Sequence, residues 1–286
     1  MTLAGKTLVI SGGSRGIGEA IALRAARDGA NVALLAKTTE PHPALPGTIH
    51  TAASAIEAAG GRALPLVGDV RDDEFVASAV QSVVREFGGI DVVVNNASAI
   101  DLSPTEQVRM KKYDLMNDIN TRGSFHLSKQ CIPFLRLAQN PHILMLSPPI
   151  SLDPKWFQSH TAYTIAKYGM SLIALGLSEE LRADGIAANA LWPRTAIDTA
   201  AVRNVIGRDL VRRSRVPAIM ADAAHAMVTR DSRRYTGNLA IDDDVLAEEG
   251  VTDFTVYLNN GGSEDELALD MWVEPRKGSV HTNTLI

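Results

Sequence analysis

The sequence predicts an α/β fold, in which helices cover both faces of a doubly wound, mostly parallel sheet of about seven strands. Two observations predict it. Apolar runs of four to six residues alternate with longer segments of helical period along most of the chain, which is typical of repeated βα units. The 286 residues suffice for one large domain or two small ones, and the alternation runs without a linker to about residue 241. We therefore expect a single domain over residues 1–250 and a C-terminal extension over residues 251–286.

The predicted strands are near-continuous apolar runs, as expected where both faces of a sheet are buried. They are Thr7–Ser11, Asn31–Ala36, Ala63–Val67, Val92–Asn95, Ile143–Ser147, Ala187–Trp192 and, more weakly, Asn238–Ile241. The segments between them have the apolar spacing of helices. We expect helices at Ile17–Arg27, His50–Ala59, Asp73–Phe87 and Thr161–Arg182, with one or two more across Lys111–Arg136. Lys37–Thr48 holds three prolines and is predicted as a loop inserted after the second strand.

Composition and charge exclude several classes of protein. A net charge of −5 argues against a nucleic-acid-binding protein, which is usually strongly basic. Cys131 is the single cysteine, so no internal disulfide can form and a reducing compartment is favoured. We see no apolar stretch long enough to span a membrane and no secretory signal at the N-terminus, and we expect a cytoplasmic protein. The seven histidines lack metal-ligand spacing, so no metal site is predicted. Asp242–Asp244 is interpreted as a solvated turn rather than a calcium loop.

A glycine-rich segment follows the first predicted strand directly. Residues 11–18 read SGGSRGIG and lead into a helical pattern. Glycines allow a tight turn and a close backbone approach, while the N–H groups and dipole of the following helix attract phosphate. Because the segment lies between a strand and a helix at the start of a βαβ series, it predicts a dinucleotide-binding, or Rossmann, fold rather than an ordinary turn.

The end of the second predicted strand indicates which dinucleotide is expected. Folds that prefer NAD usually place Asp or Glu there, where the carboxylate accepts a hydrogen bond from the ribose 2′-hydroxyl. Here the strand is followed by Lys37, and the first acidic residue is Glu40. Lys37 and Arg15 could flank a 2′-phosphate, or both could be solvated surface cations. We predict NADP as the cofactor, with NAD as the less favoured alternative.

Several motifs, in this order and spacing, resemble the short-chain dehydrogenase/reductase family. Besides the glycine-rich segment they are Asp69-Val70, Asn95–Ala97 and residues 163–167, which read YTIAK. The resemblance covers Leu3–Tyr257. Longer strings, such as LSPP at residues 146–149 and AYTIAKYGM at residues 162–170, resemble one subgroup of the family. Longer members of that subgroup carry a C-terminal sterol-carrier-like lipid-binding domain, for which the residues after position 257 are too few.

The resemblance implies a catalytic pair with a clear chemical logic. Hydride transfer to a carbonyl leaves negative charge on oxygen, so Tyr163 would supply the proton. A free tyrosine titrates near pH 10, and Lys167, four residues further on the same helical face, would provide a positive field and bind the nicotinamide ribose. Asn120 would order a relay water, or simply kink its helix. The cofactor-binding residues implied are Gly12, Ser14, Arg15, Gly16, Ile17, Gly18, Lys37, Asp69, Val70, Asn96, Tyr163, Lys167, Pro193 and Thr195.

Within that set, the resemblance places Gly12, Gly16 and Gly18 at the diphosphate and Asp69 at the adenine edge. Asn95 would help to hold the central strand and the cofactor ribose. Two purely structural alternatives remain for these residues. Asp69 could cap the following helix, and Asn95 could satisfy buried backbone groups.

The sequence also departs from the family pattern. Pro148 stands where the family usually has the serine that binds the substrate carbonyl, and proline has neither a side-chain donor nor an N–H. Ser147 and Ser151 are the candidate replacements, and the spacing favours neither. Arg194 replaces a glycine near the predicted substrate mouth, where it would bind an acidic substrate or remain a solvated charge. Ser98 replaces another glycine, which is a small change.

We therefore expect NADP-dependent hydride transfer between nicotinamide and a carbonyl or secondary alcohol, on a small apolar or acyl-type substrate related to lipids. The alternatives are an enoyl- or dienoyl-CoA reductase, and a low-turnover NADP-binding protein that acts through lipid binding or assembly. The segment Thr161–Arg182 has more apolar surface than one buried stripe requires, which predicts a homodimer or homotetramer.

Overall fold

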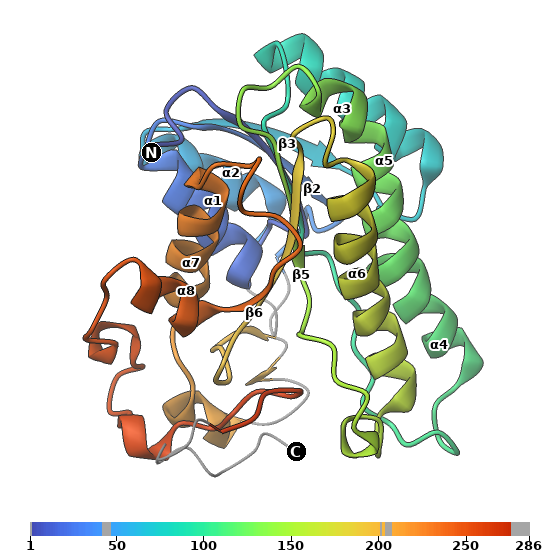
Figure 1. Cartoon of the computed structure of the whole chain (residues 1–286), viewed down its shortest axis with the longest axis vertical. Coiled ribbons are helices and arrows are strands. Elements are labelled where there is room, and N and C mark those ends of the chain that lie inside the picture. The colour runs from blue at the N-terminus through green and yellow to red at the C-terminus, as the bar shows by residue number, and fades with distance from the viewer. Residues whose placement is uncertain (1, 42–46, 201, 204–207, 276–286) are drawn as a thin grey trace.

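The computed structural model describes residues 2–41, 47–200, 202–203 and 208–275, and it confirms the α/β fold (Figure 1). One seven-stranded sheet has the order β3-β2-β1-β4-β5-β6-β7, and every neighbouring pair is parallel. The order reverses between β1 and β4, so the carboxyl ends of the strands open into a crevice there. The strands are β1 (Thr7–Ser11), β2 (Asn31–Ala36), β3 (Arg62–Val67), β4 (Val92–Asn95), β5 (His142–Leu146), β6 (Ala187–Trp192) and β7 (Leu239–Ile241).

Helices cover both faces of the sheet (Figure 1). One layer holds α1 (Gly16–Ala26), α2 (Ile49–Ala58), α7 (Ala218–Thr229) and α8 (Asp242–Glu248). The other holds α3 (Asp73–Phe87), α5 (Ser124–Leu135) and α6 (Thr161–Glu180), with α4 (Met110–Met116) joined to α5 through a π-helical segment, Asn117–Gly123. Each layer buries one apolar cluster against the sheet, because strands covered on both faces present apolar side chains to both sides.

The predicted elements agree with the observed ones to within one or two residues, and the main differences lie after β6. Helix α7 was not predicted, because its sequence AIMADAAHAMVT is apolar on most sides and shows little contrast between faces. The interpretation of Asp242–Asp244 as a solvated turn was wrong. These residues form the first turn of α8, and Asp242 and Asp243 are buried. The inserted loop Lys37–Thr48 lies partly outside the described residues, at positions 42–46.

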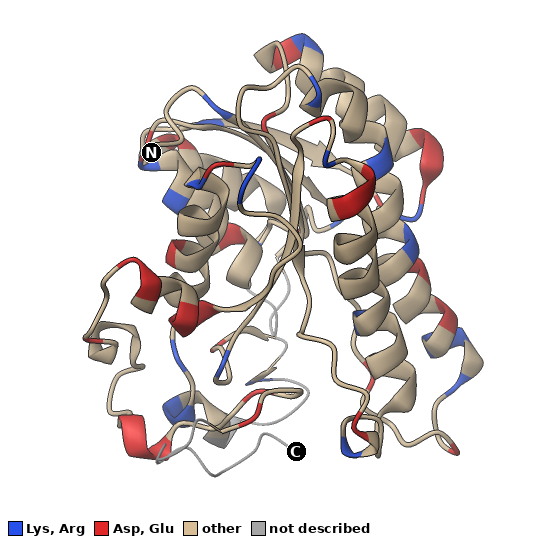
Figure 2. Cartoon of the chain, in the orientation of Figure 1, with Lys and Arg blue, Asp and Glu red and all other residues tan. Residues whose placement is uncertain are grey.

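Charged residues lie mainly on the outer helices and loops, with both signs interspersed (Figure 2). The strands of the sheet carry few of them, as the buried sheet requires. Among the described residues, no helix is both long enough and apolar enough to cross a membrane. The same residues contain no group of three or more acidic, histidine or cysteine side chains arranged to hold a metal ion.

The chain after α8 contains two short 3-10 turns, Thr255–Tyr257 and Glu264–Glu266, followed by a buried segment, Leu267–Val273. This buried segment, which we call the tail segment, runs beside the residues that follow β6. Ala196 N–H donates to Ala268 O and Asp270 N–H donates to Arg194 O, each at 2.9 Å. The carboxyl edge of the sheet and the tail segment therefore lie at the same end of the molecule (Figure 1).

Candidate active site

The glycine-rich turn between β1 and α1 is closely packed against the end of β4. Gly12 and Gly16 have φ values of +70° and +61°, in the left-handed region that favours glycine. A Cβ on Gly18 would lie 2.5 Å from Asn96 Nδ2, and this nitrogen donates to Ser11 O at 3.1 Å and to Gly12 O at 2.9 Å. Asn96 thus fixes the turn, and α1 begins at Gly16 with its backbone N–H groups at the crevice.

The neighbouring residues of the predicted phosphate site are held by the same turn. Ser14 is buried, and its carbonyl oxygen lies against Gly47, where a Cβ would come within 2.8 Å of it. Ile17 is half-buried and packs against the core cluster under α1. The Arg15 guanidinium donates to Gly47 O at 3.2 Å. The segment from Ser14 to Ile17 is therefore positioned by backbone contacts, as a phosphate cradle requires.

The cationic group expected at the ribose is already paired with an acid. Lys37 Nζ lies 3.1 Å from Asp69 Oδ2, and Arg71 binds the same carboxylate at 2.6 Å. Hydrogen bonds from Arg71, opposed in part by burial and helped by Lys37, hold the pKa of Asp69 well below its usual range. Val70 beside it is buried. Lys37 keeps an exposed side chain, so it can still turn toward a 2′-phosphate, and Asp69 keeps its place just after β3.

Two asparagines tie the end of β4 to the helices behind it. Asn95 Nδ2 donates to Ser128 Oγ at 2.9 Å. Asn120 accepts from Ala99 N–H at 2.8 Å and donates to Ala99 O at 3.0 Å, so both ends of its amide hold the chain after β4. Asn120 lies in the π-helical segment, a feature that is frequent at functional sites. These contacts make the Asn120 side chain a positioning group for the loop.

Tyr163 and Lys167 lie in the first two turns of α6, and both side chains are buried. Lys167 Nζ donates to Leu146 O at 2.6 Å and lies 5.1 Å from the ring centre of Trp192, which ends β6. Burial lowers the pKa of Lys167 to about 7. Burial also raises the pKa of Tyr163 above its ordinary value, and the negative charge of Asp270 acts in the same direction. Burial therefore sets the direction of the Tyr163 pKa shift in the protein, and a hydrogen bond with Ser98 opposes it.

Neither candidate serine replaces the missing donor in an obvious way. The Ser147 hydroxyl is buried and has no hydrogen-bond partner in the part of the chain that the structure describes. Ser151 is held by its own loop, since its N–H donates to Tyr168 Oη at 3.3 Å and its Oγ accepts from Asp153 N–H at 3.3 Å. Pro148 is buried between them, and its carbonyl oxygen accepts from Ser171 Oγ at 2.6 Å.

Arg194 is not a cation at the substrate mouth. Its guanidinium is buried, and Nε lies 2.7 and 2.8 Å from the two carboxylate oxygens of Asp243. A second bond runs from the guanidinium to Asp244. Arg194 therefore joins the end of β6 to α8 and is not available to an acidic substrate, which also explains why the aspartates after β7 are not a solvated turn.

The residues at the crevice fit a dinucleotide. Asn95 Oδ1, Ser147 Oγ and Thr195 Oγ1 are buried without a hydrogen-bond partner within the described residues, and buried polar groups in native proteins are normally paired. Thr195 and the buried Pro193 follow β6, on the opposite side of the crevice from the glycine-rich turn. When bound, a nicotinamide dinucleotide supplies or accepts hydride, and the glycine-rich turn, Asn96 and Thr195 would hold it.

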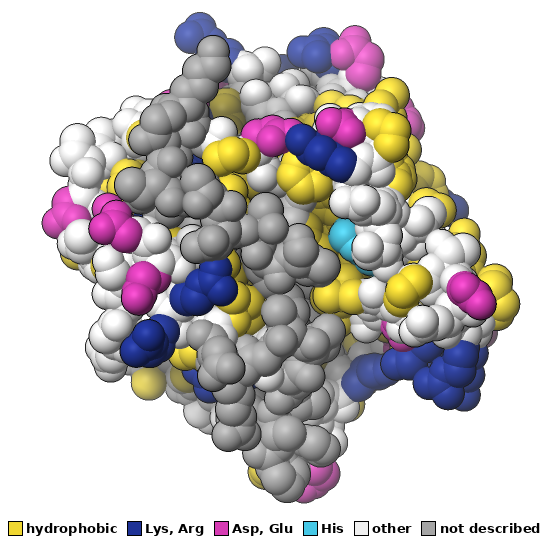
Figure 3. Space-filling view, turned by 90° about the horizontal axis from the view of Figure 1, so that it is seen from below, with side chains coloured by type: hydrophobic (Ala, Val, Ile, Leu, Met, Phe, Trp, Pro, Cys, Tyr) yellow, Lys and Arg dark blue, Asp and Glu magenta, His cyan; other side chains and the backbone are white. Residues whose placement is uncertain are grey.

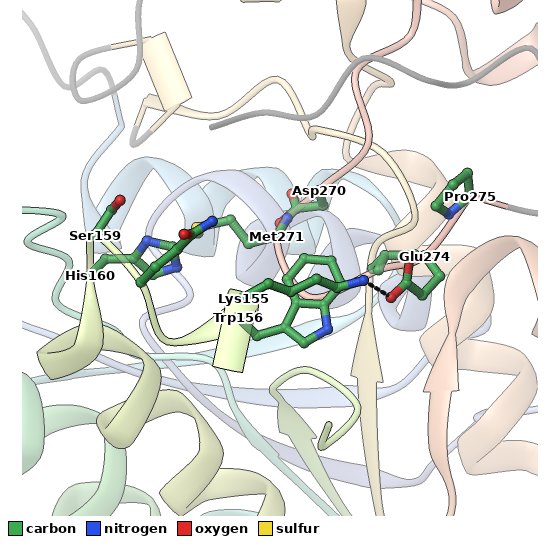
Figure 4. Close-up of a pocket in the computed structure, with 10 residues that line it drawn as sticks. Lys155, Trp156, Ser159, His160, Asp270, Met271, Glu274 and Pro275 are labelled. Carbon is green, nitrogen blue, oxygen red and sulfur yellow. Dashed lines mark hydrogen bonds and ion pairs between the residues drawn. The ribbon is translucent and has the colours of Figure 1, made fainter. Parts of the chain in front are cut away.

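The sequence did not predict the part of the site that the tail segment builds. A cavity of about 280 Å³ lies between the loop before α6 and the tail segment (Figure 4). Hydrophobic side chains gather near the middle of this end of the molecule (Figure 3). The Lys155–Glu274 ion pair connects the loop before α6 to the residue that directly follows the tail segment. The lining residues are Lys155, Trp156, Gln158, Ser159, His160, Asp270, Met271, Val273, Glu274 and Pro275.

Trp272 anchors the tail segment against the catalytic helix. Its ring centre lies 5.6 Å from that of Tyr163 and 5.4 Å from that of Trp192, and its Nε1 donates to Trp156 O at 3.1 Å. Its φ of +63° is rare for a bulky residue, and such strain persists only where the surroundings hold it, typically at a functional site. The signal in the sequence was the apolar trio Met271–Val273 within an acidic, irregular stretch.

Comparisons with known proteins show the family of the chain. A model of the short chain dehydrogenase family matches residues 6–208. Hydroxysteroid dehydrogenase-like protein 2 of Xenopus laevis is 57% identical over 260 residues, which are 91% of this chain and 62% of that protein. The Homo sapiens protein of the same name is 52% identical over 255 residues, 89% of this chain and 60% of that protein. The chain thus spans about three fifths of the length of these curated relatives.

Solved structures of similar proteins have the same fold as this chain. A short chain dehydrogenase from Mycobacterium thermoresistibile has a TM-score of 0.90 at 57% identity, over 96% of both chains. A metagenomic short-chain oxidoreductase in complex with NADP has a TM-score of 0.70 at 25% identity, over 84% of this chain and 98% of that chain. A Mycobacterium paratuberculosis short chain dehydrogenase bound to NAD shares the fold, with a TM-score of 0.71 at 20% identity, over 84% of this chain and 97% of that chain.

The resemblance noted in the sequence is therefore confirmed, both for the family and for the subgroup of hydroxysteroid dehydrogenase-like protein 2. One of the structural matches was solved with NADP and another with NAD, so the matches do not choose between the two dinucleotides. The chain belongs to the short chain dehydrogenase family, which indicates an NAD(P)-dependent oxidoreductase.

Proposed function

We propose that the protein uses NADP to transfer hydride between nicotinamide and a carbonyl or secondary alcohol. The observation that carries this proposal is the burial of Tyr163 and Lys167 together on α6, at the carboxyl edge of the sheet. Tyr163 would exchange the proton with the substrate oxygen. Lys167 would bind the nicotinamide ribose after leaving Leu146 O, and Asn120 would hold the loop after β4 in place.

The preference for NADP is supported by the end of β2. Lys37 follows the strand, and its exposed amino group lies beside the crevice, where an NAD-preferring fold would have a carboxylate. Asp69 competes for Lys37, so we expect the preference for NADP to be moderate.

The substrate proposed is an apolar or acyl-type molecule of the kind found in lipid metabolism. The aromatic and aliphatic side chains of Trp156, Met271 and Val273 line the cavity, and the Lys155–Glu274 ion pair leaves no net charge at its rim. An acidic substrate is not favoured, because Arg194, the cation that could have bound it, is paired with Asp243. Reduction of an enoyl-CoA remains the second candidate, because Pro148 supplies no donor to a carbonyl oxygen.

The test is direct. The protein is incubated with NADPH or NADH and with panels of ketones, aldehydes and enoyl-CoAs, and the absorbance of the reduced nicotinamide is followed. Turnover of ketones or aldehydes with a preference for NADPH is the expected result. Turnover of enoyl-CoAs alone would favour the second candidate, and tight NADPH binding without any turnover would favour a binding protein.

We also propose that the protein forms a homodimer or homotetramer through α6, and that it works in the cytoplasm. Three apolar side chains are exposed on this helix: Ile165 (44%), Leu172 (60%) and Leu175 (36%). Apolar side chains that are grouped on the surface in this way are typical of an interface between subunits. Light scattering of the purified protein should give a mass of two or four chains, and Leu172→Glu should lower it. A strictly monomeric wild-type protein would contradict this assembly.

A further inference from the structure

Asp270 connects the cavity to the catalytic pair. Its side chain is on the cavity wall, and the residue is only 9% exposed. Two residues further on, the Trp272 ring packs on Tyr163 and on Trp192. The Trp192 indole donates to Met271 O at 3.0 Å, and Lys167 Nζ lies over the same indole. A ligand that fills the cavity therefore contacts Asp270, whose charge acts on both Tyr163 and Lys167.

The backbone fixes the direction of this carboxyl. Asp270 N–H donates to Arg194 O at 2.9 Å, and Asp270 Oδ1 accepts from Met271 N–H at 2.7 Å. With one oxygen held in this way, the carboxyl has little freedom to turn. A rigidly placed donor or acceptor is the type of group that stabilises charge as it develops in a transition state.

Pro148 replaces the serine that usually binds the substrate carbonyl, so one donor of the usual set is missing. The Ser147 hydroxyl is buried without a hydrogen-bond partner among the described residues, Ser151 Oγ accepts from Asp153 N–H, and the Ser98 hydroxyl bonds with Tyr163 itself. We propose that the carboxyl group of Asp270, in its neutral form, donates a hydrogen bond to the carbonyl oxygen of the substrate beside Tyr163, and so takes the place of the missing serine. This inference rests on the proposed carbonyl reduction.

The surroundings favour a neutral Asp270. Burial, together with the charge of Asp242 on α8, raises its pKa to about 8, while Met271 N–H, Lys167 and Trp192 oppose the shift. Lys167 donates to Leu146 O rather than forming a close ion pair with this carboxyl, and Tyr163 carries no charge at neutral pH. A buried carboxylic acid kept neutral near pH 7 is known to act as a hydrogen-bond donor in other enzymes.

The chemistry balances with the proton of Asp270 retained. Hydride forms the new C–H bond at the carbonyl carbon, the electron pair of the C=O π bond moves to oxygen, and that oxygen takes the proton of Tyr163. The Asp270 O–H bond does not break, because the carboxyl only donates a hydrogen bond to the oxygen as its charge grows.

His160 gives independent evidence that the cavity receives a ligand. It lines the same cavity, it is 7% exposed, and neither ring nitrogen has a hydrogen-bond partner among the residues described. Burial lowers the pKa of His160, so the ring is neutral and offers one donor and one acceptor. A polar group on the bound molecule would pair with it.

The test compares two variants of Asp270, one without a hydrogen-bond donor and one that keeps a donor. Asp270→Ala removes the donor and should lower kcat/KM about 10²-fold with NADPH and 4-nitrobenzaldehyde. Asp270→Asn keeps an N–H donor and should stay within about tenfold of the wild type. The matched control is Asp265→Ala, on the exposed side of the same region, which should leave turnover unchanged. Tm and the Kd for NADPH are measured for each variant to show that the fold and the cofactor site are intact.

The pH profile separates this donor from a purely structural role. The wild type should lose activity as the pH rises through about 8, because the carboxylate cannot donate. Asp270→Asn should lack the limb near pH 8, and the fall in activity that remains should follow Lys167, whose pKa is about 7. Pro148→Ser, added to Asp270→Ala, should recover part of the activity by restoring a hydroxyl on the opposite side of the carbonyl.

Three results would overturn the inference while the proposed function stands: Asp270→Ala as active as the wild type, Asp270→Asn as impaired as Asp270→Ala, or an unchanged pH limb in Asp270→Asn. The second result would make Asp270 a counterion of Lys167 instead. A wild-type protein that reduces no carbonyl compound would refute the proposed function, and the role of Asp270 with it.

Discussion

The two sides of the active site are built in different ways. The cofactor side consists of tight turns at the carboxyl ends of β1, β3 and β4, where backbone geometry and small residues do most of the work. The substrate side consists of bulky side chains from the loop before α6 and from the tail segment, which are more than a hundred positions apart in the chain. The cofactor side therefore tolerates few changes in shape, whereas the substrate side can change with a few side chains. This difference is the physical basis on which one fold serves many substrates.

The largest expected effect lies where the two sides meet. Tyr163→Phe removes the only group proposed to deliver a proton, and it should lower kcat by ~10²-fold or more. Because the ring remains packed on Trp272, the Tm and the Kd for NADPH should change little. Steady-state kinetics and fluorescence titration of NADPH measure the two effects. Full turnover by Tyr163→Phe would remove Tyr163 from the mechanism.

The cofactor side should be sensitive to a single methyl group. In Gly18→Ala, the new Cβ would lie 2.5 Å from Asn96 Nδ2 and 2.8 Å from Gly12 O. Alanine favours a helix over glycine by ~1 kcal/mol, but overpacking typically destabilises by ~1–3 kcal/mol, so the clash should prevail. We expect the Kd for NADPH to rise about tenfold or more, as measured by titration.

The control for that change is Gly89→Ala. A Cβ at Gly89 meets no atom within 4 Å, and the variant should bind NADPH as the wild type does. Equal affinities for Gly18→Ala and the wild type would mean that the turn is looser than its contacts with Asn96 indicate.

The substrate side should respond through KM rather than through the cofactor. Trp272→Ala removes the ring that packs on Tyr163 and Trp192 and should reduce the free energy of unfolding by ~3–5 kcal/mol. The KM for a carbonyl substrate should rise about tenfold, by the loss of roughly 1.4 kcal/mol of binding, with the Kd for NADPH nearly unchanged.

Leu152→Ala serves as the comparison for Trp272→Ala, since Leu152 is 81% exposed in the same loop region and should be neutral. A rise in the Kd for NADPH that equals the rise in KM would show that the two sides are not separate.

The smallest effect concerns the choice of dinucleotide. Lys37→Ala should raise the Kd for NADPH several-fold, because an exposed cation contributes only ~1 kcal/mol or less to such a pair. NADH lacks the 2′-phosphate and is the internal control, so its Kd should not rise. A parallel loss for both cofactors would place Lys37 in a structural role with Asp69.

The sequence predicted the fold and the family because their signals are local. Each of these signals lies within a short stretch of sequence. The first strand and the glycine-rich turn fall within residues 7–18, and Tyr163 and Lys167 are four positions apart. Two positions were interpreted less well. Arg194 was expected either to bind an acidic substrate or to remain a solvated charge, and Asp243 was expected in a solvated turn. A sequence does not show that these two charges pair with each other 49 positions apart.

Periodicity, turn chemistry and motif spacing are properties of neighbouring residues, and so the sequence alone specified the α/β sheet and the glycine-rich turn, and it placed Tyr163 and Lys167 on one helix. The cavity, the burial of Asp270 and the left-handed backbone of Trp272 depend on which distant segments meet. Their energies come from desolvation and packing, which exist only after the tail segment lies against α6 and β6. For that reason only the tertiary structure assigned the substrate side of this site, and with it the carboxyl group beside Tyr163.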